Sequence, residues 1–280
     1  MQNYINYLQL NLEKILKNRF SKKIRGRNID YNIVLPLIIF LVFVLCASSY
    51  YLISTLLKDK KENDKFENLE QIIIENNIDE NDKIQEENSN TTNYSNIDLN
   101  TLKIQNNDLI GWIKIDNSNI NYPVMPNGNY YLRRNFYKTY SKLGTPYLAD
   151  YCNIRTSDIL TIFGHHINQG YMFADLLKYQ NYDYYKSHKY IKFYTLEDDK
   201  TIENIYEVCF AFKIKAERYS YYSYTRFYDE NDLKEYVENC KNLSFYNTDT
   251  KFDYGNQFIT LSTCEYSQNN GRMIVIGVKK

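Results

Sequence analysis

The stretch Phe258-Ile-Thr-Leu-Ser-Thr-Cys264 is an apolar run that ends at a cysteine. The polar residues 265–271 follow it, and Arg272 then opens a second apolar run. A hairpin of this kind places the last residue of one strand beside the first residue of the next. We therefore predict that Cys264 and Arg272 are neighbours at one rim of a sheet.

Other short apolar or alternating runs precede this hairpin. Together with the hairpin they give about eight strands, at 112–115, 120–124, 146–149, 159–163, 191–194, 205–214, 258–262 and 273–278. Evenly scattered short strands are typical of a closed barrel or a sandwich rather than a parallel sheet. Helical spacing of apolar residues predicts two helices, at 172–179 and 229–243, and Asp98 could cap a short helix that runs through Asn106. We expect residues 98–280 to form one mainly β domain with peripheral helices.

Residues 31–57 form an uncharged apolar run near the start of the chain. As a helix this run would be about 40 Å long, enough to cross a hydrocarbon core of about 30 Å. Residues 1–30 carry seven basic side chains, whereas 58–90 carry five lysines and eleven acids. The positive-inside rule then predicts a basic cytoplasmic tail (1–30) and one transmembrane helix (31–57) in contact with membrane lipid. The chain would be a single-pass type II protein of the cell membrane.

The apolar run has two other interpretations. A signal peptide cleaved near Ala47 fits less well because the apolar run continues past that residue. A lipoprotein anchor at Cys46 fits less well because Leu45 stands where a small residue is usual. Residues 58–97 are polar and acidic, so we expect an extracytoplasmic linker, with a possible short helix through Phe66.

Composition argues against several classes of protein. Lys and Arg total 34 and so do Asp and Glu, and a balanced charge argues against nucleic-acid binding. The sequence has no Cys-x-x-Cys and no glycine-rich phosphate loop, so we expect no cofactor. A metal site at His165, His166 and Cys264 is disfavoured, because adjacent side chains on an extended segment point opposite ways.

The residues at the predicted rim suit acyl transfer. His165 follows the strand at 159–163 after Gly164, so it should reach the same region as Cys264. A free thiol has a pKa of about 8.5, and a nearby imidazole can take its proton. Arg272 could stabilise an oxyanion. Only one of His165 and His166 can face the thiol.

A structural interpretation competes at each position. A cysteine on a strand is often a small buried hydrophobe, and we interpret Cys152, Cys209 and Cys240 in this way. Disulfides among these three are left open. A histidine after glycine can be structural, and an arginine that opens a strand can be a surface charge.

These motifs resemble those of the sortases. Thr260-Leu-Ser-Thr-Cys264 followed by Arg272 matches the Thr-Leu-x-Thr-Cys…Arg signature, and Phe163-Gly-His-His166 matches the histidine segment. The similarity to class B sortases covers the whole external domain, including Gly111-Trp-Ile-Lys-Ile115. Papain-like and NlpC/P60-like peptidases place Cys before His, which is not the order here.

The resemblance implies an eight-stranded barrel and a cysteine transpeptidase of the cysteine endopeptidase class. Such an enzyme cuts a sorting signal, Asn-Pro-x-Thr-like in class B, after the Thr of a secreted protein. It transfers the acyl group from a thioacyl intermediate to a peptidoglycan precursor or cross-bridge amine. The catalytic residues would be Cys264, His165 and Arg272, with the backbone N–H of Glu265 in the oxyanion hole. Ser262 and Thr263 would line the substrate groove. Tyr266 stands where some members carry an acid, so no catalytic carboxylate is assigned.

Three functional alternatives stay open at this point. A pilin-polymerising sortase would use a lysine amine as its acceptor. A cysteine endopeptidase would transfer the acyl group mainly to water. A non-enzymatic surface module would carry Cys264 as a structural residue only.

Overall fold

The computed structural model describes residues 10, 11, 14, 31–75, 97–126, 128–218 and 224–280. The predicted cytoplasmic tail and much of the predicted linker lie outside these residues. The chain divides into two compact units, Met1–Lys58 and Asp59–Lys280. Each is described separately below.

Helix α2 (Tyr31–Glu75) contains the apolar run and continues well beyond it. The apolar part of α2 is long and apolar enough to cross a membrane, and its most apolar stretch is not buried by the protein. Three of its hydroxyls are paired within the helix, because Ser48 donates to the carbonyl of Leu45, and Ser54 and Thr55 donate to that of Tyr51. A helix whose polar groups are paired internally is compatible with a membrane environment.

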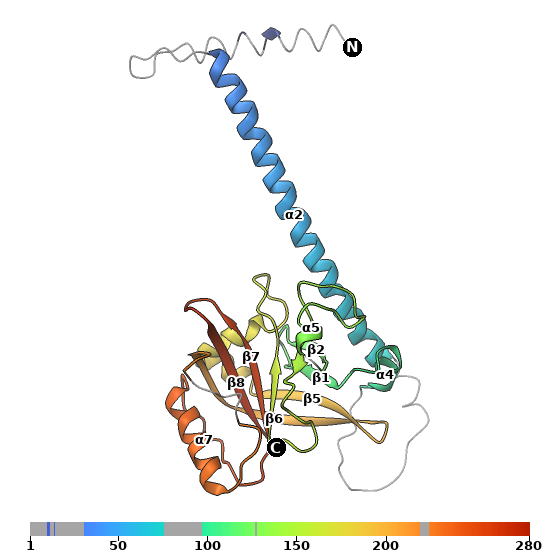
Figure 1. Ribbon diagram of the computed structural model, residues 1–280, viewed down its shortest axis with the longest axis vertical. Helices are drawn as coiled ribbons and strands as arrows, with labels where there is room; N and C mark the ends of the chain where they lie inside the picture. The colour runs from blue at the N-terminus through green and yellow to red at the C-terminus, as the bar shows by residue number, and fades with distance from the viewer. Residues whose placement is uncertain (1–9, 12–13, 15–30, 76–96, 127, 219–223) are drawn as a thin grey trace. The chain divides into compact units, whose positions relative to one another are not determined.

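The second unit is a nearly closed barrel of eight strands (Figure 1). The order across the sheet is β2-β1-β5-β6-β8-β7-β4-β3. The strands are β1 (Gly111–Lys114), β2 (Asn121–Val124), β3 (Tyr147–Leu148), β4 (Ile159–Phe163), β5 (Tyr190–Glu197), β6 (Lys200–Lys215), β7 (Phe258–Glu265) and β8 (Gly271–Lys279). The barrel closes where Met125, just after β2, pairs with Tyr147 of β3. The predicted closed eight-stranded barrel is confirmed.

One strand pair differs from the expected antiparallel pattern. Strand β4 pairs with β7 in parallel, with Phe163 opposite Ser262. Parallel neighbours need a long connection, and here the intervening strands and helices supply it. This pairing brings the histidine segment and the cysteine strand to the same end of the barrel.

Strands β5 and β6 form a hairpin that is longer than the sequence suggests. Asp198 and Asp199 both have positive φ, of 47° and 60°. Two such residues make the type of two-residue turn that matches the twist of paired strands. Strand β6 begins at Lys200, five residues before the predicted start at Ile205, and the sequence hides this part because its buried positions, Thr201 and Asn204, are polar.

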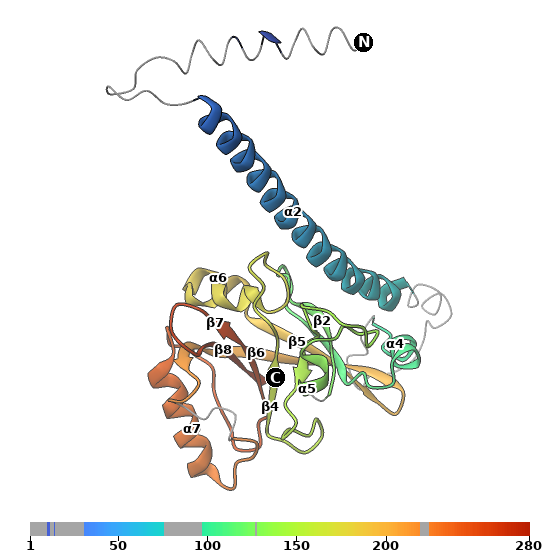
Figure 2. The same ribbon diagram turned by 45° about the horizontal axis from the view of Figure 1, so that its top comes forward.

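Short helices surround the barrel (Figure 2). They are α4 (Asn100–Gln105), α5 (Gly128–Tyr131), η1 (Ala174–Gln180), α6 (Tyr182–Ser187) and α7 (Glu230–Leu243). Two of the helices, α5 and α6, were not predicted. The helix expected at 172–179 is the 3₁₀ helix η1. Asp229 caps α7, since its carboxylate accepts hydrogen bonds from the backbone N–H groups of Asn231 and Asp232.

Two apolar clusters form the core. The larger fills the barrel and includes Trp112, Ile113, Leu261 and Val275. The smaller lies on the outer face of β6, β7 and β8 and includes Leu233 and Tyr236 of α7. Side chains on both faces of β6, β7 and β8 are therefore buried. This explains why apolar residues follow one another in these strands.

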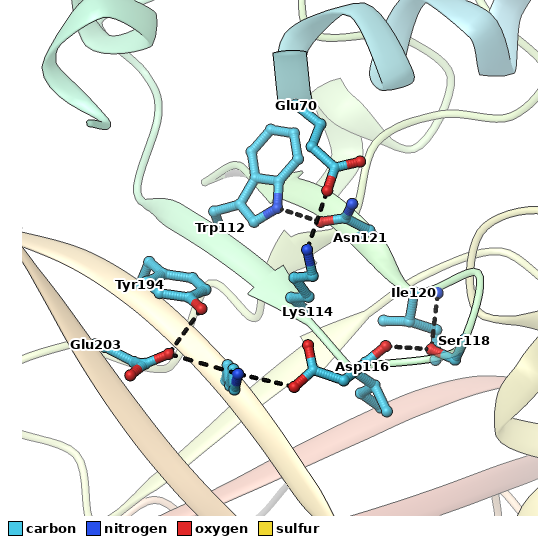
Figure 3. Close-up of polar contacts among 11 residues, drawn as sticks. Glu70, Trp112, Lys114, Asp116, Ser118, Ile120, Asn121, Tyr194 and Glu203 are labelled. Atoms are coloured by element: carbon cyan, nitrogen blue, oxygen red, sulfur yellow. Dashed lines mark hydrogen bonds and ion pairs between the residues drawn. The ribbon is translucent and has the colours of Figure 1, made fainter. Parts of the chain in front are cut away.

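The residues of α2 that follow Lys58 belong to the barrel unit. Phe66, Leu69 and Ile73 of this segment are fully buried in the larger cluster. Glu70 forms an ion pair with Lys114 of β1 at 3.0 Å, beside the hydrogen bond from Trp112 to Asn121 (Figure 3). The possible helix through Phe66 is therefore present, as a packed element of the domain.

Candidate active site

Cys264 and Arg272 lie opposite each other on β7 and β8, as the hairpin argument predicts. Both side chains are half-buried, and both line a shallow depression of about 400 Å³ formed by residues 264–272. Cys264 is a free thiol. The guanidinium of Arg272 donates one hydrogen bond to the carbonyl of Gly271 at 2.9 Å. A guanidinium has five N–H groups, so others can serve a ligand.

The histidine segment reaches this rim through the parallel pairing of β4 with β7. The backbone N–H of Gly164 donates to the carbonyl of Ser262 at 3.1 Å, and the hydroxyl of Thr263 donates to the carbonyl of Gly164 at 2.8 Å. Strand β4 ends at Phe163, and continuing its register by two residues would place the main chain of His165 opposite Cys264. Gly164 is required because a Cβ there would lie 2.6 Å from the ring of Phe173.

The imidazole of His165 has a defined partner and tautomer. Its Nε2 lies 2.8 Å from the carbonyl oxygen of Leu132. A carbonyl can only accept, so Nε2 carries the proton and Nδ1 holds the lone pair of the neutral ring. Burial lowers the pKa of His165, and the charge of Arg133 lowers it further, although the Leu132 carbonyl raises it. The ring is therefore a neutral base at neutral pH.

His166 is the histidine whose ring contacts the cysteine residue, through the Cys264 main chain. Its Nδ1 lies 3.2 Å from the carbonyl oxygen of Cys264, and its ring stacks on Tyr266 with centroids 5.2 Å apart. The hydroxyl of Tyr266 donates to the His166 carbonyl at 3.4 Å. The two adjacent histidine rings thus have different partners, as expected for neighbouring side chains that point in opposite directions from an extended segment. Tyr266, which stands where some sortases carry an acid, thus joins the histidine segment to the end of the cysteine strand.

Glu265 organises the turn between Cys264 and Arg272. Its buried carboxylate accepts hydrogen bonds from the backbone N–H and hydroxyl of Ser267, and it pairs with Lys213 of β6 at 3.1 Å. Although burial raises the pKa of Glu265, the Ser267 hydrogen bonds and the Lys213 charge hold it below its ordinary value. An ionised carboxylate thus fixes the turn whose main chain carries the predicted oxyanion donor.

The two expected groove residues are covered by protein. Ser262 and Thr263 are 0% and 2% exposed, and the Thr263 hydroxyl joins β7 to the histidine segment. Their assignment to the groove stays a prediction.

Tyr147 is a site residue that sequence reasoning missed. Burial raises its pKa, and negative charge on Asp150 and Cys264 raises it further, whereas Arg272 lowers it. Tyr147 also lies opposite Phe163 across β3 and β4, two residues before His165, which places it beside the histidine segment. Its ring also packs on Phe163, at 5.6 Å between centroids. No spacing signal in the sequence could have found it, because barrel closure brings β3 to this place.

The other cysteines differ in burial. Cys209 and Cys240 are buried in the cluster beneath α7, while Cys152 is half-buried with its thiol near the carbonyl of Ile159. A hollow of about 1130 Å³ includes Lys279 at the far end of β8 and is separate from the rim that carries Cys264.

Comparison with known proteins gives one consistent family. No family model matches the chain. Sortase B of Listeria monocytogenes is 31% identical over 188 residues, covering 64% of this chain and 73% of that protein. Sortase B of Staphylococcus aureus is 27% identical over 243 residues, covering 85% of this chain and 93% of that protein.

Solved structures agree at the level of the fold. The Staphylococcus aureus sortase B–substrate complex superposes with a TM-score of 0.65 at 23% identity, covering 80% of this chain and 98% of that one. Both the barrel and the sequence similarity to curated relatives extend over most of the chain. The chain therefore belongs to the class B sortases, a family of cysteine transpeptidases.

Proposed function

We propose that this protein is a membrane-anchored transpeptidase that cleaves an Asn-Pro-x-Thr-like sorting signal of secreted proteins after Thr. The acyl group would pass to an amine of a peptidoglycan precursor or cross-bridge. The observation that carries the proposal is the pairing of Cys264 with Arg272 at the rim that the histidine segment reaches. A relative of the same fold is described as a sortase B–substrate complex, which supports a peptide substrate.

The site residues suggest the order of events. His165 takes the thiol proton of Cys264 at Nδ1, and the sulfur attacks the carbonyl carbon of the Thr. Arg272 and the backbone N–H of Glu265 stabilise the oxyanion. The peptide C–N bond then breaks, and His165 returns its proton to the leaving amine. An acceptor amine attacks the thioester and passes a proton to His165, the C–S bond breaks, and His165 returns that proton to the sulfur to regenerate the thiol.

The membrane anchor is part of the proposal. The charge difference between 1–30 and 58–90 supports a cytoplasmic N-terminus and an extracytoplasmic barrel. That side of the membrane is where secreted substrates and wall amines are found. Anchoring by one helix would hold the enzyme in the cell membrane.

A product assay distinguishes the possible outcomes. Full-length protein in detergent micelles is given an Asn-Pro-x-Thr peptide with separate amine acceptors, and the products are weighed by mass spectrometry. An amide to a glycine-type amine supports wall anchoring. An amide to a lysine side chain would indicate a pilin polymerase, and free acid alone an endopeptidase.

A thiol-directed probe separates catalysis from a structural cysteine. Selective labelling that is lost in Cys264→Ala supports the enzyme, whereas an inert Cys264 supports a non-enzymatic module. We also expect His165→Ala to abolish turnover while His166→Ala keeps much of it. The reverse result would move the proton-transfer role to His166.

A further inference from the structure

The segment 59–73 of α2 makes polar contacts with the barrel in addition to its apolar ones. Asn63 is buried, and its side-chain oxygen accepts a hydrogen bond from the hydroxyl of Tyr122 at 3.1 Å. The amide nitrogen of Asn63 donates to Glu67 one turn later, which fixes the orientation of the amide. A buried helix residue thus meets a buried tyrosine of β2.

The same tyrosine holds the histidine segment. The hydroxyl oxygen of Tyr122 accepts a hydrogen bond from the backbone N–H of Met172 at 3.0 Å. Met172 has a positive φ of 58°, which is uncommon for a residue other than glycine. A hydrogen bond from another segment helps to hold this backbone conformation. Tyr122 is only 3% exposed, so this hydrogen bond is made by a buried side chain.

Met172 and its neighbour hold both histidines by their main chain. Met172 forms an isolated β-bridge with His166. The backbone N–H of Phe173 donates to the carbonyl of His165 at 2.9 Å. Hydrogen bonds thus link Asn63 to Tyr122 and Tyr122 to Met172, and Met172 pairs with the histidine segment. Both hydrogen bonds are buried.

The helix also reaches the other support of His165. Glu62 accepts a hydrogen bond from the amide nitrogen of Asn135 at 3.0 Å. The side-chain oxygen of Asn135 in turn accepts from the backbone N–H groups of Tyr137 and Thr139. This fixes the loop that begins after Leu132, the residue whose carbonyl binds the His165 ring.

We propose that Asn63 and Tyr122 are positioning residues that set the histidine segment for proton transfer. The segment 59–73 of α2 is then a working part of the enzyme, beyond its role as a connection to the apolar run. This inference rests on the proposed function, because it takes His165 as the group that carries the proton.

The test compares two tyrosine variants of the full-length protein in micelles. Tyr122→Phe removes the hydroxyl that links Asn63 to Met172. The matched control is Tyr194→Phe, which removes a similarly buried hydroxyl that donates to Glu203 at 2.7 Å. Loss of one buried partner corresponds to about a tenfold effect. We expect kcat to fall about tenfold in Tyr122→Phe, with KM for the peptide within about twofold and the control unchanged.

Hydrogen exchange gives a readout that does not depend on activity. Amides of 164–173 should exchange faster in Tyr122→Phe than in Tyr194→Phe, with equal melting temperatures for the two variants. Asn63→Leu, which removes the acceptor oxygen, should reproduce the loss of kcat. This second variant keeps the test valid if Tyr122→Phe folds poorly.

The results distinguish a failure of the proposed function from a failure of the positioning role. If the wild type forms no amide product, the proposed function fails, and exchange alone decides whether Tyr122 holds the segment. If the wild type is active but Tyr122→Phe matches its control in kcat and exchange, the positioning role is refuted. Equal kcat for Asn63→Leu and wild type would refute it as well.

Discussion

The ion pair between Lys213 and Glu265 fixes the turn beside the nucleophile, so its removal should weaken the barrel at this rim. We consider Lys213→Met, which keeps the aliphatic length of the side chain and removes the charge. Glu265 is 4% exposed, and its carboxylate lies 3.1 Å from the Lys213 ammonium. The variant would leave a buried carboxylate without its cation.

The expected cost follows from the geometry. At an effective dielectric constant of about 20, two charges about 3 Å apart attract by roughly 5 kcal/mol, and desolvation offsets part of this. Breaking a buried pair typically costs about 3–5 kcal/mol. Lys213 is 24% exposed and Ser267 still donates two hydrogen bonds to Glu265, so the loss should be smaller. We expect a decrease of about 2 kcal/mol in the free energy of unfolding at pH 7.

The effect should depend on pH in a defined direction. The pKa of Glu265 is lowered in the folded protein, so its contribution is fully present above the unfolded value of about 4.3. It is lost as the pH falls through the folded pKa, because the carboxyl is then protonated in both states. The stability difference between Lys213→Met and wild type should therefore disappear at low pH.

Denaturant unfolding of the full-length protein in micelles measures this. Trp112, the single tryptophan, is fully buried in β1 and reports unfolding by its fluorescence. A double-mutant cycle with Glu265→Gln isolates the pair, and the coupling energy should account for most of the loss. A difference below about 0.5 kcal/mol at pH 7, or one that persists unchanged in acid, would refute the reasoning.

Three further outcomes are expected. Because burial lowers the pKa of His165, the acid limb of the kcat/KM profile should lie below the ordinary histidine value of about 6.5, and a limb above it would contradict the assignment. Gly164→Ala places a methyl group 2.6 Å from the ring of buried Phe173, so the melting temperature should fall by an amount that corresponds to about 1–3 kcal/mol, and turnover should fall with it. Asp229→Ala removes the cap of α7 and should cost about 1 kcal/mol in denaturant unfolding with the thiol reactivity of Cys264 unchanged.

Much of the local structure was readable from the sequence. All eight strands were predicted in the right places, because alternating or continuous apolar runs are a direct consequence of burying one or both faces of a sheet. Errors fell where local signals are weak. Polar residues hid the first part of β6, and aromatic-rich 182–187 gave no helical period, so α6 was missed.

The site likewise has one part that local sequence determines and another that depends on long-range contacts. The adjacency of Cys264 and Arg272 follows from hairpin geometry, which depends only on residues close together in the chain. The position of the histidine segment depends on the parallel pairing of β4 with β7, between residues about a hundred positions apart. The motif order suggested that these segments meet, but spacing alone could not give the pairing.

The sequence by itself therefore determined the apolar N-terminal helix, the strand pattern and the family signature, since each is encoded over short distances. Only the tertiary structure decided which partners hold the two imidazoles, that Tyr147 and Tyr266 lie at the site, and that 59–73 packs on the barrel. Those contacts join segments far apart in the chain, and their formation depends on how the closed barrel shares its interior and rim among all of its strands.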